Sequence, residues 1–276
     1  MPLLDGGMRD AWLWLGASVA VAILWSNLSW LFAPWAERSE KGPTSGSLAE
    51  TIVSRMANWR FASSVFQVLR GLYFLGLPAA ALFWGRDAVI GRFLGLKPLV
   101  LPNQIEGGQD ALLSAAWSAW AYDLGSAATI GVGAGLLLFL AALARRRALT
   151  GMGSDRTGPS RSPLLNARET LYHEAHWAFY RNAPIVALGP YWGPWTGLAL
   201  AGIEALLNPH WRTSLNSPGS AWQAMSQAAL AVVSTLLFLQ TQNVWLALLA
   251  HWGIACALGT VYSSTLDYSG ERSLDR

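Results

Sequence analysis

The chain has 276 residues, of which 53% are hydrophobic and only 13% are charged, and its formal net charge is +3. Soluble domains carry roughly 25% charged residues, so this composition excludes an ordinary soluble protein and predicts a membrane protein. Sixteen tryptophans agree with that class, because Trp concentrates at membrane–water interfaces. The small positive excess argues against nucleic acid as a partner. The single cysteine, Cys256, excludes an internal disulfide and a cysteine-based metal cluster.

Apolar stretches that could cross a bilayer recur along the whole chain. A hydrocarbon core of about 30 Å needs about 20 apolar residues in a helix. The stretches that qualify lie near 11–34, 62–84, 126–144, 185–207, 221–240 and 243–263. We therefore expect an all-α, polytopic membrane helical bundle of about six transmembrane helices, within a range of about six to eight, plus interfacial helices. No connection is long enough to bury a core of its own, so residues 1–276 are expected to form a single integral-membrane domain.

The longest polar connection, residues 145–168, is rich in arginine. Its only acidic residue is Asp155. Its basic residues are Arg145, Arg146, Arg147, Arg156, Arg161 and Arg168. Cytoplasmic loops of membrane proteins carry an excess of Lys and Arg, so this loop is predicted to be cytoplasmic and the N-terminus to lie outside. The expected localisation is the bacterial cytoplasmic membrane, with the lipid bilayer as the first partner.

The segment "ARETLYHEAHWAFYRNAPI", residues 167–185, combines charge, histidine and aromatic side chains at the edge of an apolar stretch. On a helix of about 100° per residue, four polar residues share one face: Glu169, His173, His176 and Tyr180. Glu174 and Arg181 share a second face, which predicts an ion pair. A carboxylate beside two imidazoles suits a metal site or a general acid–base site. The alternative is a half-buried interfacial helix, whose His, Tyr and Trp side chains tolerate a wet–dry boundary.

Two further histidines follow downstream. His210 lies in "EALLNPHWR", just after the fourth apolar stretch, and His251 lies inside the sixth. A histidine among small residues in a membrane helix either performs chemistry or hydrogen-bonds a neighbouring helix.

The order of these residues over 165–260 resembles the CAAX-processing and bacteriocin-processing (CPBP) intramembrane proteases. The family pattern is E-E-x-x-x-R, then F-x-x-x-H, then H-x-x-x-N. In this sequence Arg181, His210 and His251 match the arginine and the two histidines. The sequence departs from the pattern where His176 and Trp177 replace the paired glutamates, Leu206 replaces the phenylalanine and Ala255 replaces the asparagine. The resemblance implies a polytopic helical protein whose site opens within the membrane.

The resemblance also implies an activity, the hydrolysis of membrane-associated peptides by a glutamate and histidines that activate water. Glu169 is the expected base, because it shares a helix face with His176, and Glu174 is the other candidate. The candidate catalytic residues are Glu169, Glu174, His176, Arg181, His210 and His251. If a divalent metal such as zinc takes part, its expected ligands are His173, His176, His210 and His251.

Three other functions are compatible with the sequence. The departures from the motif favour a non-catalytic member of the family, a pseudoenzyme that serves as a subunit or assembly factor of a membrane-protein complex. His251, with Gly253 and Ala255 nearby, could instead bind a tetrapyrrole, because small residues leave room for a flat macrocycle. Arg70 and the Pro/Gly-interrupted segment 188–197 would fit a transporter, although no internal repeat supports one.

Overall fold

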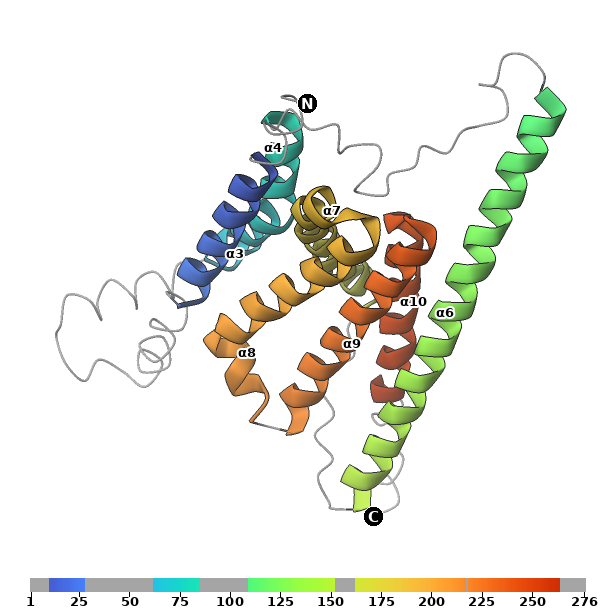
Figure 1. Ribbon diagram of the computed structural model, residues 1–276. Helices are drawn as coiled ribbons and strands as arrows, with labels where there is room; N and C mark the ends of the chain where they lie inside the picture. The colour runs from blue at the N-terminus through green and yellow to red at the C-terminus, as the bar shows by residue number, and fades with distance from the viewer. Residues whose placement is uncertain (1–9, 28–61, 85–108, 152–161, 217, 264–276) are drawn as a thin grey trace, which may run out of the picture.

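The computed structural model describes residues 10–27, 62–84, 109–151, 162–216 and 218–263, which are almost entirely helical and contain no strand (Figure 1). The expected all-α class is therefore confirmed for this part of the chain. The elements are a helix over 10–27, α3 (Ala62–Gly71), the π-helix η1 (Leu72–Gly76), α4 (Leu77–Trp84), α6 (Gln109–Gly151), α7 (Pro163–Leu207), α8 (Pro209–Ser214), α9 (Pro218–Thr241) and α10 (Val244–Ser263).

Four of the described helices are long and apolar enough to cross a membrane. The qualifying segments are Ser64–Ala81, Trp117–Ala148, Ser220–Thr241 and Val244–Val261. They coincide with the predicted spans 62–84, 126–144, 221–240 and 243–263. The predicted span 11–34 is described only as far as residue 27, and the predicted span 185–207 forms part of α7. The structure thus supports an integral membrane protein with four candidate spans in its described part, and does not confirm the expected number of about six.

The boundaries of the arginine-rich segment also differ from the prediction. Residues 145–151 continue α6, and α7 begins at Pro163, so the described ends of this stretch are helical rather than loop. The long run of helix-forming residues in "AALARRRALTG" explains the extension. Residues 152–161 lie outside the described residues.

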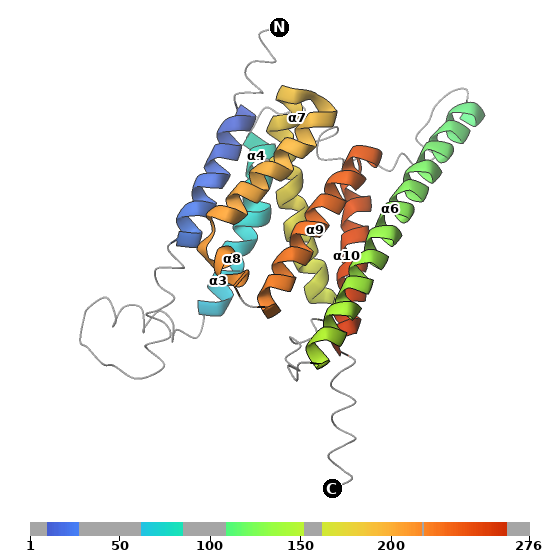
Figure 2. The ribbon, with the colours of Figure 1, turned by 60° about the horizontal axis from the view of Figure 1, so that its bottom comes forward.

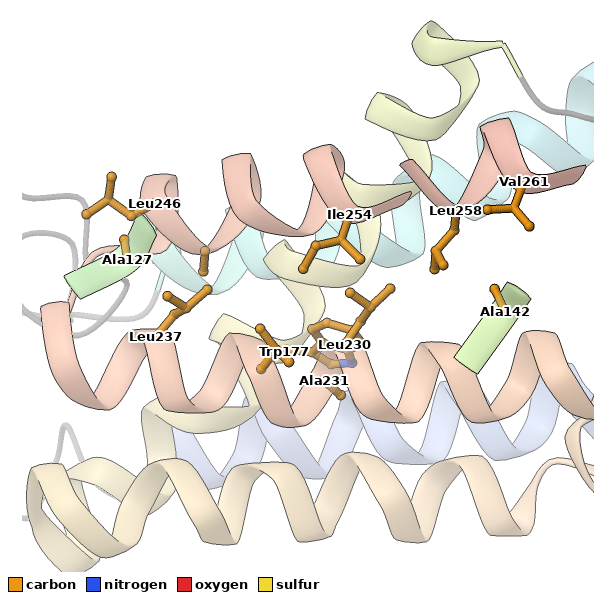
Figure 3. Close-up of a cluster of buried hydrophobic side chains, with 12 residues drawn as sticks. Ala127, Ala142, Trp177, Leu230, Ala231, Leu237, Leu246, Ile254, Leu258 and Val261 are labelled. Carbon is orange, nitrogen blue, oxygen red and sulfur yellow. The ribbon is translucent and has the colours of Figure 1, made fainter. Parts of the chain in front are cut away.

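Helices α9 and α10 pack against each other at the centre of the bundle, with α6 on one side and α7 on the other (Figures 1 and 2). Helix α7 separates this group from η1 and α4, which it contacts on its opposite side. The main apolar cluster joins α6, α7, α9 and α10 and includes Trp177, Leu237 and Ile254 (Figure 3). Glycines on α6 allow the close approach of α10, since a Cβ at Gly131 would lie 3.2 Å from that of Ala250.

Helix α7 is not a straight rod. Gly189 has φ +82°, a conformation that favours glycine, and Pro190 and Pro194 follow it. The chain reverses here, and the two arms of α7 pack antiparallel as a hairpin. The arms touch through glycine: a Cβ at Gly197 would lie 2.8 Å from Arg181 Cα. A Cβ at Gly193 would overlap the backbone of Ile185. The segment 188–197 therefore contains the hairpin turn, at Gly189, and the beginning of the second arm, which packs closely against the first.

The first arm of α7 is more deeply enclosed than the sequence suggested. The half-buried interfacial helix was one of the two alternatives for the segment 167–183, but every residue from His176 to Ile185 is buried. This burial is possible because Glu174, His176 and Arg181 each have a hydrogen-bond partner on another helix or on the second arm of α7.

The hairpin contact gives a direct test. We expect Gly197→Ala to lower the free energy of unfolding by about 1–3 kcal/mol, because the added methyl group meets the backbone of the facing arm. The matched control is Gly202→Ala on the same arm, where a Cβ meets nothing within 4 Å. It should be neutral or stabilising by up to about 1 kcal/mol. Thermal unfolding in detergent measures both, and equal effects of the two substitutions would contradict the hairpin.

Candidate functional site

The two polar faces predicted for the first arm of α7 are present and point to different neighbours. Glu169, His173 and His176 face α3 and η1, where Phe74 contacts the rings of both histidines. Glu174 and Arg181 face α9 and α10. The first arm therefore presents a polar set to each of two groups of neighbours, and the His173 ring, 6.4 Å from that of His251, lies between the two sets.

The set toward α9 and α10 is a buried chain of four side chains. The carboxylate of Glu174 is 0% exposed and lies 2.9 Å from His251 Nδ1 on α10. Its other oxygen accepts a hydrogen bond of 2.6 Å from the hydroxyl of Ser234 on α9. That hydroxyl in turn accepts one of 2.7 Å from the guanidinium of Arg181, which also lies over the ring of Phe238. The predicted Glu174–Arg181 pair thus exists in a bridged form, with Ser234 between the charges.

Capping residues at the starts of α7 and α10 fix the positions of these groups. Ser162 caps α7 by accepting from the amide of Leu165, and Pro163 occupies the first turn, so the register of the arm is fixed from its start. Asn243 caps α10 in the same way, with its side-chain oxygen accepting from the amide of Trp245 at 3.0 Å. His251 follows two turns later on the face that meets Glu174.

The opposite set of polar residues joins the first arm of α7 to the second arm, to η1 and to α3. His176 Nε2 lies 3.0 Å from a carboxylate oxygen of Glu204 on the second arm of α7, and Tyr73 of η1 donates to the other oxygen at 3.2 Å. At the start of the arm, Glu169 forms a two-pronged ion pair with Arg70 of α3. Arg168 makes a further contact to Glu169. Arg70, which lies within the apolar stretch 62–84, therefore has its counter-charge on α7.

A cavity of about 730 Å³ lies where the starts of α7 and α9 meet α8 and α10, and we call it the α7–α9 cavity. Its ionisable lining residues are Arg70, Arg168, Glu169, His173, His210 and His251. His251 thus lines the cavity while its Nδ1 is held by Glu174 behind it. No described residue hydrogen-bonds the other ring nitrogen, Nε2. Trp177 lies parallel to the His251 ring at 5.4 Å and fixes its plane.

The cavity gathers three of the predicted catalytic residues and leaves three away from its lining. Glu169, His210 and His251 line it, whereas Glu174 and Arg181 stand behind His251 in the buried chain. His176 is directed to Glu204 on the other side of the arm.

The four histidines predicted as metal ligands are not gathered at one point. Among the described residues, no group of three or more His, Cys, Asp or Glu side chains could hold a metal ion. The physical reason is that His176 does not line the cavity and is directed to Glu204 on the second arm of α7, away from the other histidines. The predicted four-histidine zinc site is therefore not assembled in this part of the chain.

Sequence reasoning missed three members of the two polar sets, namely Tyr73, Glu204 and Ser234. Two of them carry a signal that could have found them. Glu204 is a lone carboxylate in the apolar stretch "LALAGIEALL", and Ser234 interrupts the apolar helix "VVSTLLF". Polar groups at such positions in membrane helices usually have a partner on another helix. Tyr73 carries no comparable signal, because tyrosine is common at membrane interfaces.

Comparisons with known proteins add no identification: no protein-family model, curated protein or solved structure matches this chain.

The bridging role of Ser234 can be tested by removing its hydroxyl. Ser234→Ala leaves a buried carboxylate oxygen and a guanidinium N–H without their partner, so we expect a loss of about 1–3 kcal/mol in stability. The control is Ser226→Ala on the same helix, whose hydroxyl bonds only the carbonyl of Trp222. That change should stay within about 0.5 kcal/mol. Denaturant titration of the detergent-solubilised protein measures both, and an unaffected Ser234→Ala variant would show that the chain of contacts is not formed.

Proposed function

We propose that this protein is a multi-pass hydrolase of the bacterial cytoplasmic membrane that cleaves membrane-associated peptides, with His251 as its general base. One observation carries the proposal: His251 lines the α7–α9 cavity while its Nδ1 is hydrogen-bonded to a fully buried carboxylate. A carboxylate behind an imidazole fixes the tautomer and orientation of the ring and stabilises the imidazolium that forms when the ring takes up a proton.

The chemistry follows from that arrangement. With Nδ1–H donated to Glu174, the unprotonated Nε2 takes a proton from a water molecule as the water oxygen attacks the scissile carbonyl carbon. The carbonyl oxygen becomes an oxyanion, and the imidazolium then gives the same proton to the leaving amine as the C–N bond breaks. Arg181 donates to Ser234, and Ser234 donates to one oxygen of Glu174, so this chain of hydrogen bonds holds the carboxylate in position behind His251.

The role of Glu169 changes in this proposal. It was the base expected from the sequence, but both of its oxygens are engaged by arginines. Because arginines occupy both of its oxygens, Glu169 instead shapes the charge of the cavity, and Glu174 supports the base from behind. Arg181 and His251 are two of the three matches to the CPBP pattern, and their presence in one buried chain supports kinship with that family. We therefore propose that the protein is related to the CPBP family and that its catalytic pair consists of Glu174 and His251.

A non-catalytic member of the same family is the second candidate. The observation that favours it is that the same four buried side chains connect α7, α9 and α10, which is a structural role in its own right. Such a protein would lose stability when Glu174 or Ser234 is altered and would show no turnover in its native form.

A turnover assay separates the two candidates. The protein is reconstituted in liposomes with a pool of single-span peptides, and cleavage products are identified by mass spectrometry. His251→Gln and Glu174→Gln should each lower the rate by about 10²–10⁴-fold, since the first removes the general base and the second removes the carboxylate that orients it. His176→Gln is the control, because His176 contacts Glu204 rather than the cavity, and it should retain turnover once its folding is verified. Cleavage that survives His251→Gln would overturn the assignment of the base, and its absence in the native protein would favour the non-catalytic candidate.

A further inference from the structure

The α7–α9 cavity has a second property that the proposed hydrolysis does not use. Two buried donor nitrogens, Arg168 Nε and Gln227 Nε2, have no hydrogen-bond partner among the described residues, and both side chains line this cavity. A buried polar group without a partner costs about 1–3 kcal/mol. The cost is recovered when a ligand supplies acceptor atoms, so these two donors indicate a ligand rich in oxygen.

The charge of the lining indicates that this ligand is an anion. Arg70 and Arg168 face the cavity against a single carboxylate, Glu169, which leaves an excess of one positive charge. Arg70 directs two of its nitrogens to Glu169, whereas Arg168 directs only one, its NH2 at 3.2 Å. The guanidinium of Arg168 therefore keeps most of its N–H groups for a ligand.

The position of the cavity indicates where such an anion would come from. The cavity is lined by residues from the starts of α7 and α9. Helix α6 ends at this same end of the bundle (Figures 1 and 2). Arg145 stacks over Trp222 and Arg146 donates to the carbonyl of Val261 at the same end. With Arg70 and Arg168, four arginines lie at this end of the bundle. An excess of arginine is typical of the cytoplasmic side of a membrane protein, where anionic phospholipids gather.

Apolar surface beside the cavity suits acyl chains. Leu165 lines the cavity and is 43% exposed, and the neighbouring Leu164 is 83% exposed. A headgroup in the cavity would leave its chains against these leucines within the bilayer. A free phosphate ion would gain nothing from them.

We infer that the α7–α9 cavity binds the phosphate group of an anionic phospholipid from the cytoplasmic leaflet. Arg168 is the principal charged donor and the Gln227 amide is the second. The phosphate offers several acceptor oxygens with negative charge, which suits the planar fork of an arginine. Inorganic phosphate shares this chemistry but lacks the acyl chains. This inference stands apart from the proposed hydrolysis, because binding at Arg168 requires no turnover at His251.

Binding of three probes to the full chain in a neutral detergent tests the inference. The probes are dioctanoyl phosphatidylglycerol, dioctanoyl glycerol and inorganic phosphate, and affinity is measured by calorimetry. We expect phosphatidylglycerol to bind most tightly and dioctanoyl glycerol at least about tenfold more weakly, since it lacks the charge-assisted hydrogen bonds. Inorganic phosphate binding as tightly as the lipid would support the phosphate site and assign it to the free ion.

Two substitutions localise the site. Arg168→Gln should weaken phosphatidylglycerol binding about tenfold, whereas Arg212→Gln should change it by less than about twofold. Arg212 is the matched control because it is an exposed arginine of α8 that does not line the cavity. If Arg168→Gln fails to fold, judged by circular dichroism and gel filtration, Gln227→Leu is the second variant and should weaken binding about threefold.

Equal losses from the Arg168 and Arg212 substitutions would overturn the site, as would equal binding of phosphatidylglycerol and dioctanoyl glycerol. A Glu174→Gln variant, once its folding is verified, separates this inference from the proposed function. It should lose turnover and still bind phosphatidylglycerol within about twofold of the native affinity, because Glu174 does not line the cavity.

Discussion

The fully buried carboxylate of Glu174 is the constraint on which the rest of the structure depends. An ionised group without partners in a low-dielectric interior costs several kcal/mol, so the surrounding helices must supply donors. They do so from two directions, with Ser234 from α9 and His251 from α10. Arg181 adds the counter-charge from α7 itself, through Ser234. The relative positions of α7, α9 and α10 are thereby set by polar contacts as well as by the apolar cluster around Trp177.

The hairpin of α7 makes this arrangement possible. A straight helix would need a separate helix to cover its second polar face. In α7 the second arm runs back along the first and brings Glu204 to His176. The return is close because glycine at 193 and 197 lets the two backbones approach. Each polar face of the first arm is then satisfied by a different neighbour. A segment with two acids, two histidines and two arginines can therefore pack against other helices of an apolar bundle.

Much of this could be predicted from the sequence, and the parts that could not have physical reasons. Low charge and recurring apolar stretches gave the helical membrane class, and helical periodicity separated Glu169, His173 and His176 from Glu174 and Arg181. Periodicity cannot show which neighbour each face meets, so the sequence alone left open how deeply the segment 167–183 is buried. The positive φ of Gly189 determines a reversal that composition alone does not distinguish from a kink. The bridging position of Ser234 depends on the rotation of α9, which apolar patterning leaves undetermined, because that helix is apolar on several sides.

The most direct test of the central claim is the protonation of His251 in the folded protein. ¹⁵N nuclear magnetic resonance of histidine-labelled protein in detergent distinguishes the two ring nitrogens, and comparison with His251→Gln assigns the signals. If Glu174 holds Nδ1, neutral His251 should carry its proton on Nδ1 and leave Nε2 unprotonated, and Glu174→Ala should shift this balance toward the Nε2–H form. A native protein in which His251 is protonated on Nε2 alone, with no response to Glu174→Ala, would contradict the Glu174–His251 contact and the account built on it.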